Sequence, residues 1–177
     1  CNEALLMEHL LQSTQDRRRR AWLLNHFLEQ FRTTVFRQTM FAEFELIAHT
    51  MAEQGQPLTR ESLSKAYYEL NQKYYGAVCT VDENIANEWM RIPHFYRSYY
   101  VYVYATGLCA AVSLSDKILS EGESAVRDYR KFLSAGCAVP PIDALKLAGI
   151  DMSSPEPIRR ALGVFKDTLA QFKAVMV

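Results

Sequence analysis

The chain has 177 residues, of which 49% are hydrophobic, so it is long enough and apolar enough for one globular domain with a real core. Its 20 basic and 20 acidic residues give a net charge of zero, and hence no reason to expect nucleic acid or an acidic membrane as partner. No apolar run reaches the roughly 18 residues of a membrane span, and no signal peptide is visible.

Four cysteines are scattered along the chain, and none forms a CxxC pair. This spacing argues against a zinc finger or a thioredoxin-like site and fits a reducing cytoplasm. Cys109 and Cys137 resemble small buried apolar residues.

Almost every segment places apolar residues at helical spacing, so we expect an all-α fold without strands. The chain enters a helical pattern directly at Cys1, which suggests a piece of a longer protein. Thr59 and Asp82 are expected N-caps, because their side chains can accept hydrogen bonds from the first turn. The expected helices cover residues 2–14, 18–54, 59–75, 82–89, 93–119, a segment ending at 136, 142–148, and a last segment from 154.

Complete catalytic motifs are absent from the chain. A zincin needs HExxH, with two histidines one helical turn apart and a glutamate base between them. The histidines His9, His26, His49 and His94 do not fit this pattern, and no GxSxG, phosphate loop or GxGxxG occurs. We expect His9, His26 and His49 to be structural or exposed.

Glu43 and Glu45 flank Phe44 on the long predicted helix, where they lie on different faces. They therefore do not form a ready acid and base pair. The simpler interpretation is that they are surface charges or partners of nearby arginines such as Arg37.

Residues 94–107 hold five of the ten tyrosines, directly after the break at Pro93. At the expected helical spacing, Phe95, Tyr99 and Tyr102 share one face, and Tyr96 shares another with Tyr100. Both stripes can belong to the core, or one can line a cleft, and composition alone leaves both interpretations open. A phenol, with an ordinary pKa of about 10, stays protonated at neutral pH and can donate a hydrogen bond to a developing oxyanion.

Three stretches, residues 2–6, 31–45 and 92–107, resemble the C-terminal part of oligoendopeptidase F within the thimet oligopeptidase-like zinc metallopeptidases. The resemblance implies a cytoplasmic peptidase that cuts short oligopeptides in a mostly helical channel. Members of this family bind zinc through HExGH and a later glutamate. Neither is found here, and the resemblance places the glutamate ligand before Cys1.

The resemblance also implies roles for the tyrosine-rich segment. Tyr102 matches the tyrosine that hydrogen-bonds the tetrahedral intermediate, so we expect it to be catalytic. His94, Tyr99 and Tyr96 are expected to contact the peptide. We therefore expect residues 1–177 to be the C-terminal helical portion of a peptidase catalytic domain. In this interpretation the zinc belongs to the full-length enzyme, and the partners are an oligopeptide and the missing N-terminal part.

A second hypothesis is a non-catalytic helical module that binds peptides without a metal. The coding sequence upstream of Cys1 separates the two, because HExGH there supports the peptidase and a start codon supports the module. Under either hypothesis, we expect this chain alone to bind no catalytic zinc and to be inactive.

Overall fold

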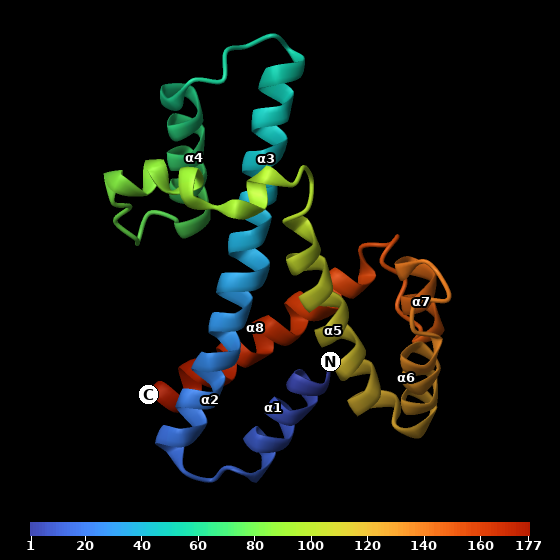
Figure 1. Cartoon of the computed structure of the whole chain (residues 1–177). Helices are drawn as coiled ribbons and strands as arrows, with labels where there is room; N and C mark the ends of the chain where they lie inside the picture. Colours follow the sequence, from blue (N-terminus) through green and yellow to red (C-terminus); the bar gives the residue numbers. More distant parts are fainter. The chain divides into compact units, whose positions relative to one another are not determined.

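The structure, a computed structural model, describes residues 1–177 and consists of helices joined by short connections (Figure 1). The expected all-α fold is confirmed. None of the helices combines the length and the apolar character of a membrane span. The elements are α1 (Asn2–Ser13), α2 (Arg17–Gln30), the π-helix η1 (Phe31–Phe36), α3 (Arg37–Glu53), α4 (Arg60–Tyr75), the 3-10 helices η2 (Glu83–Arg91) and η3 (Pro93–Tyr96), α5 (Tyr102–Glu121), α6 (Glu123–Ala135), α7 (Pro141–Leu147) and α8 (Glu156–Met176).

Local signals in the sequence set most of the helix ends. Thr59 forms a capping box with Ser62, since its side chain accepts a bond from the amide of Ser62 and the Ser62 hydroxyl accepts one from the amide of Thr59. Asp82 caps η2 by accepting a bond from the amide of Asn84 at 2.7 Å. Both predicted N-caps are confirmed. Gly76 ends α4 with a φ of 71°, a conformation that glycine adopts without steric cost.

The predicted long helix over residues 18–54 is confirmed as helical from α2 through α3, but it contains the π-helical turn η1. This turn includes the β-branched run Thr33, Thr34 and Val35, which favours a regular α-helix less than straight side chains do.

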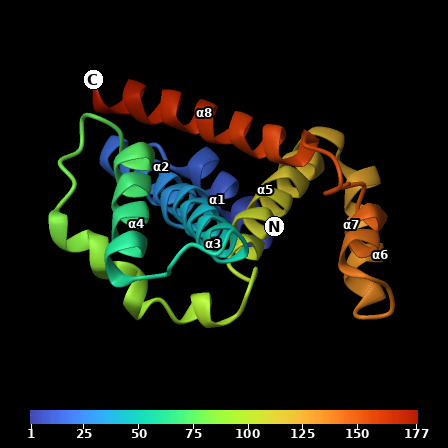
Figure 2. The same ribbon diagram turned by 90° about the horizontal axis from the view of Figure 1, so that it is seen from above.

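Two compact units make up the chain, one formed by Cys1–Arg32 and Thr106–Val177 and the other by Thr33–Ala105. The chain leaves the first unit inside η1 and returns to it inside α5. In the first unit, α8 packs across α2, as Figure 2 shows from above. Leu24 and Phe31 are fully buried there, and the ring of Phe31 lies 5.2 Å from that of Phe165.

Four consecutive arginines, Arg17 to Arg20, form the first turn of α2, where Asp16 caps the helix. Two of its arginines also bond to other helices of the first unit. Arg17 donates to the carbonyl of Val175 at 2.7 Å, and Arg20 donates to the carbonyl of Leu11 at 2.5 Å. These arginines thus satisfy carbonyls at helix C-termini, which lack partners within their own helices.

The core of the second unit is aromatic. Helices α3 and α4 lie side by side in this unit and are joined by a short loop (Figure 1). The Tyr67 ring is fully buried and packs edge-to-face on that of Phe44, with centroids 5.1 Å apart. Phe41, Leu70 and Ile92 complete this part of the core.

A buried carboxylate joins α3, α4 and η2. The Glu88 side chain is 5% exposed and accepts bonds from Arg37 at 2.6 Å, Arg91 at 2.5 Å and the Tyr67 hydroxyl at 2.7 Å. Burial alone would raise the pKa of Glu88, but the hydrogen bonds from Tyr67 and Arg37 outweigh burial and lower it. A charge this deeply buried is stable only because it is paired and hydrogen-bonded.

The prediction for the two cysteines is half confirmed. Cys109 is buried, and burial raises the pKa of its thiol. Cys137 is exposed, so the prediction that it is buried is wrong. It follows the end of α6, where the chain turns through Gly136 and nothing covers the side chain.

Candidate functional site

The candidate residues lie on the segment that joins η2 to α5, within the second unit. Ile92 is extended, as expected for a residue before proline, and Pro93 begins η3, which carries His94. The chain then leaves the helical conformation at Arg97 and re-enters it at Tyr102. The prediction of one helix over residues 93–119 is therefore wrong in its first part.

The face-sharing prediction that rested on this helix is also wrong. Phe95 packs into the core, with its ring centroid 5.5 Å from that of Phe41 and 5.2 Å from that of Phe44. Tyr99 and Tyr102 are instead half-exposed, at 49% and 50%. Phe95 is thus structural, while the two tyrosines remain partly accessible to solvent.

Tyr99 lies within this interruption between η3 and α5. Its φ is 54°, and it is the one non-glycine residue of the chain with a positive φ. This conformation costs about 1–2 kcal/mol in a residue with a side chain, and it turns the backbone out of the right-handed helix. Two side chains of α3 contact Tyr99. The Glu45 carboxylate accepts a hydrogen bond from the Tyr99 amide at 2.5 Å, and the His49 ring stacks on the Tyr99 ring with centroids 4.5 Å apart.

Glu45 is the first residue that the sequence interpretation misplaced. It was expected on the helix surface, but it is 5% exposed and bonds to a backbone 54 positions away. Glu43 is partly exposed and pairs with Lys73 and Tyr74 rather than with an arginine. The signal that was available is the position of Glu45 one helical turn after Phe41, on the apolar stripe of the helix.

His94 belongs to a cluster with Tyr100 and Tyr104. The His94 Nε2 atom lies 3.0 Å from the Tyr104 hydroxyl, and the Tyr104 hydroxyl donates to that of Tyr100 at 3.5 Å. The His94 and Tyr100 rings are nearly parallel, at 4° with centroids 6.1 Å apart. Arg97 lies over the Tyr100 ring, 4.6 Å from its centroid.

The sequence predicts no site role for Tyr104 or Tyr100, the two tyrosines of this cluster. The hydrogen bond with Tyr100 and, to a lesser degree, burial raise the pKa of Tyr104. Its phenol therefore stays protonated and holds the His94 ring at Nε2. No signal in the sequence pairs these two residues, because their contact depends on the turn between η3 and α5.

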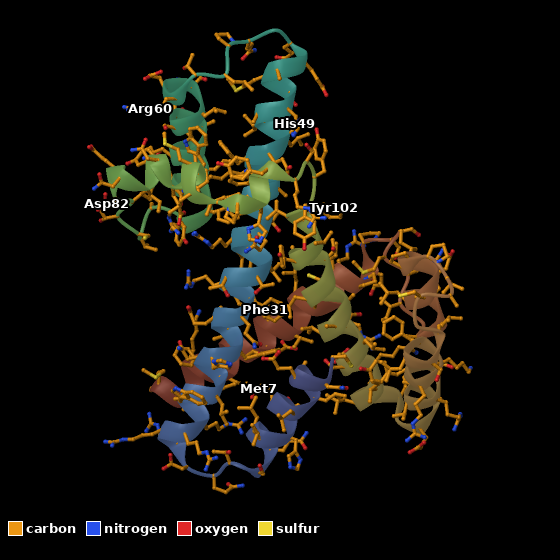
Figure 3. The ribbon with its side chains drawn as sticks, viewed as in Figure 1. Met7, Phe31, His49, Arg60, Asp82 and Tyr102 are labelled. Carbon is orange, nitrogen blue, oxygen red and sulfur yellow. The ribbon has the colours of Figure 1, made fainter.

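Tyr96 and Tyr102 complete the set of predicted site residues. Tyr96 is 83% exposed at the end of η3, and Tyr102 opens α5. Figure 3 labels His49 on α3 and Tyr102 at the start of α5. Tyr96, Tyr99 and Tyr102 are thus the exposed or half-exposed tyrosines of this segment, and His94 is half-buried.

The chain does not bring metal-ligating side chains together. No group of three or more histidine, cysteine, aspartate or glutamate side chains lies close enough together to hold a metal ion. His26 stacks on Trp22 and His49 on Tyr99, which are structural roles, as expected for these two histidines. The residues of this chain therefore do not fit a zinc site of their own.

Comparison with known proteins places these features in context. The sequence model described as Peptidase family M3 matches residues 1–164. Oligopeptidase PepF of Bacillus subtilis (strain 168) is 54% identical over 176 residues, which are 99% of this chain and 26% of that protein. Group B oligopeptidase PepB of Streptococcus agalactiae serotype III (strain NEM316) is 42% identical over 172 residues, which are 97% of this chain and 29% of that protein.

A solved structure agrees with these relatives. The crystal structure of oligoendopeptidase-F from Enterococcus faecium matches with a TM-score of 0.93 and 46% identity. The match covers 97% of this chain and 33% of that one. The chain thus spans about a quarter to a third of the length of the proteins it resembles.

Proposed function

Since this chain belongs to peptidase family M3, we propose that the protein that carries it is a zinc metalloendopeptidase that hydrolyses short oligopeptides. The resemblance to oligoendopeptidase F inferred from the sequence is confirmed by its relatives. A cytoplasmic location remains a prediction of that resemblance.

Residues 1–177 are, in this proposal, the C-terminal helical portion of the catalytic domain. The chain spans only 26% and 29% of the length of two relatives, which supports its assignment as a portion of a longer protein. The zinc ligands come from the N-terminal part of the same protein, because no group of ligand side chains converges in this chain. A zinc held by those ligands would supply Lewis-acid activation of water and of the scissile carbonyl.

The observation that carries the proposal is the position of Tyr102, a half-exposed residue, at the start of α5. Attack on a peptide carbonyl places negative charge on its oxygen. A fixed neutral donor stabilises that charge more than it stabilises the uncharged substrate. Tyr102 donates this hydrogen bond, so its phenol accelerates the reaction without strengthening substrate binding.

His94, Tyr99 and Tyr96 bind the peptide in this proposal. Because Tyr104 engages Nε2 of His94, the Nδ1 atom is the nitrogen that remains for a backbone group of the substrate. The phenols of Tyr99 and Tyr96 are exposed and provide aromatic surface with a hydrogen-bonding tip.

Tyr102→Phe in the full-length enzyme tests the catalytic role. Loss of one oxyanion donor typically lowers kcat about 10²–10³-fold, and we expect KM to change little because the ground state does not need this bond. Tyr68→Phe is the control, since the Tyr68 hydroxyl makes only a 3.4 Å contact with the carbonyl of Val81. Equal kcat for Tyr102→Phe and wild type would refute the assignment.

The metal is tested in the same assay. Cleavage by the full-length protein should stop on addition of a chelator and return with zinc, whereas the 177-residue chain alone should show no chelator-sensitive cleavage. A full-length protein that binds peptides but does not cleave them would support the non-catalytic binding module instead.

A further inference from the structure

Two side chains on one face of α3 hold a single residue of the tyrosine-rich segment. Glu45 and His49 are four positions apart, so both project from the same side of the helix. The Glu45 Oε1 atom accepts the amide of Tyr99 at 2.5 Å, and the His49 ring stacks on the Tyr99 ring at 4.5 Å and 27°. One contact fixes the backbone of Tyr99 and the other fixes its ring.

These contacts act on the least favourable backbone conformation of the chain. Tyr99 has a φ of 54°, which a residue with a side chain keeps only when its surroundings impose it. Two local turns flank Tyr99. The amide of Tyr100 donates to the carbonyl of Arg97 at 3.2 Å, and the amide of Val103 donates to the carbonyl of Tyr100 at 3.2 Å. These turn bonds do not involve the amide of Tyr99, so the contacts that fix its orientation are those from Glu45 and His49.

The burial of Glu45 supports a specific role for this contact. A carboxylate that is 5% exposed is costly to bury unless it is hydrogen-bonded. An apolar side chain at position 45 would extend the core that contains Phe41 and Phe44. The structure instead places an acceptor here, which receives the hydrogen bond of the Tyr99 amide.

We propose that Glu45 and His49 are positioning residues that hold Tyr99 in its left-handed conformation and so direct its phenol toward the oligopeptide. This inference rests on the proposed function for the identity of the substrate. Neither residue touches the peptide, and each acts through Tyr99.

The test compares variants in the full-length enzyme with a short fluorogenic peptide as substrate. Glu45→Leu removes the acceptor and Glu45→Gln keeps one. Likewise, His49→Ala removes the stacked ring and His49→Phe keeps one. Glu43→Leu is the matched control, since Glu43 lies on the same helix and contacts Lys73 and Tyr74 instead.

We expect Glu45→Leu and His49→Ala to raise KM about tenfold, because a misdirected binding group loses much of its interaction with substrate. Glu45→Gln, His49→Phe and Glu43→Leu should stay within about twofold of wild type. In a Tyr99→Ala background, Glu45→Leu should have no further effect, since it acts only through Tyr99. An equal loss in both backgrounds would overturn the proposal.

Hydrogen exchange at the Tyr99 amide gives a readout that does not need catalysis. The amide should be protected in wild type and in Glu45→Gln and should exchange at least tenfold faster in Glu45→Leu. Unchanged exchange in Glu45→Leu would overturn the proposal, whether or not the protein cleaves peptides. A wild-type protein that shows this protection but has no peptidase activity would refute the proposed function and leave the Glu45 contact established.

Discussion

Replacement of Tyr67 by phenylalanine removes one oxygen atom from the core of the second unit. The Tyr67 side chain is fully buried, and its hydroxyl donates to Oε2 of Glu88 at 2.7 Å. Arg37 and Arg91 both contact the other oxygen, Oε1. Neither arginine therefore replaces the lost bond, and Oε2 is left buried without this donor.

The magnitude follows from that geometry. A hydrogen bond to a charged group contributes about 1.5–3 kcal/mol, and the loss of a buried partner adds a desolvation cost. The phenylalanine ring fills the same space, so no cavity forms. We expect a decrease of about 2 kcal/mol in the free energy of unfolding, or about 4–8 °C in Tm for a chain of this length.

Urea unfolding of the 177-residue chain at pH 7, followed by helical circular dichroism, measures this difference. The control is Tyr68→Phe on the same helix, whose hydroxyl makes only a 3.4 Å contact with a backbone carbonyl. We expect it to cost about 0.5 kcal/mol or less. An equal cost for the two variants would refute the argument from Glu88.

The effect should also depend on pH. The pKa of Glu88 is lowered in the folded protein, so the stability from its contacts is present above the unfolded pKa of about 4.3 and is lost as the pH falls through the folded value. Because Tyr67 contributes to that lowering, the difference between wild type and Tyr67→Phe should shrink between pH 5 and pH 2. A constant difference over this range would contradict the assigned cause.

Three further predictions concern local features. Thr59→Ala removes the cap of α4 and should lower the free energy of unfolding by about 1 kcal/mol, as measured by urea unfolding. Leu24→Ala removes a fully buried side chain of the first unit and should cost about 2–5 kcal/mol in the same assay. Cys79 and Cys137 should react with a thiol reagent in the folded chain, whereas Cys109 should react only after unfolding; equal rates for all three would contradict the assigned burial.

Signals within a few residues of one another predicted the structure well. The caps at Thr59 and Asp82 were identified from residue type and position, because an N-cap bonds within its own first turn. The all-α fold was predicted for the same reason, since helical periodicity is local. The family resemblance came from three short stretches, and the relatives confirmed it.

The candidate site depended on contacts that are distant in sequence. Helical spacing placed Phe95, Tyr99 and Tyr102 on one face, but Glu45 holds Tyr99 outside any helix from 54 positions away. A periodicity argument cannot include such a contact, because it assumes a regular backbone. For the same reason, the pairing of His94 with Tyr104 was visible only in the structure.

The order of the two units along the chain determines which unit can fold first during synthesis on the ribosome. The second unit is continuous, Thr33–Ala105, so it can fold as soon as it emerges. The first unit cannot complete its fold at that stage, because the bond from Arg17 on α2 needs the carbonyl of Val175, which is made 158 residues later. The face of α2 that packs on α8 therefore lacks this partner until α8 is made, so the non-local packing of the first unit forms only after the second unit has been synthesised.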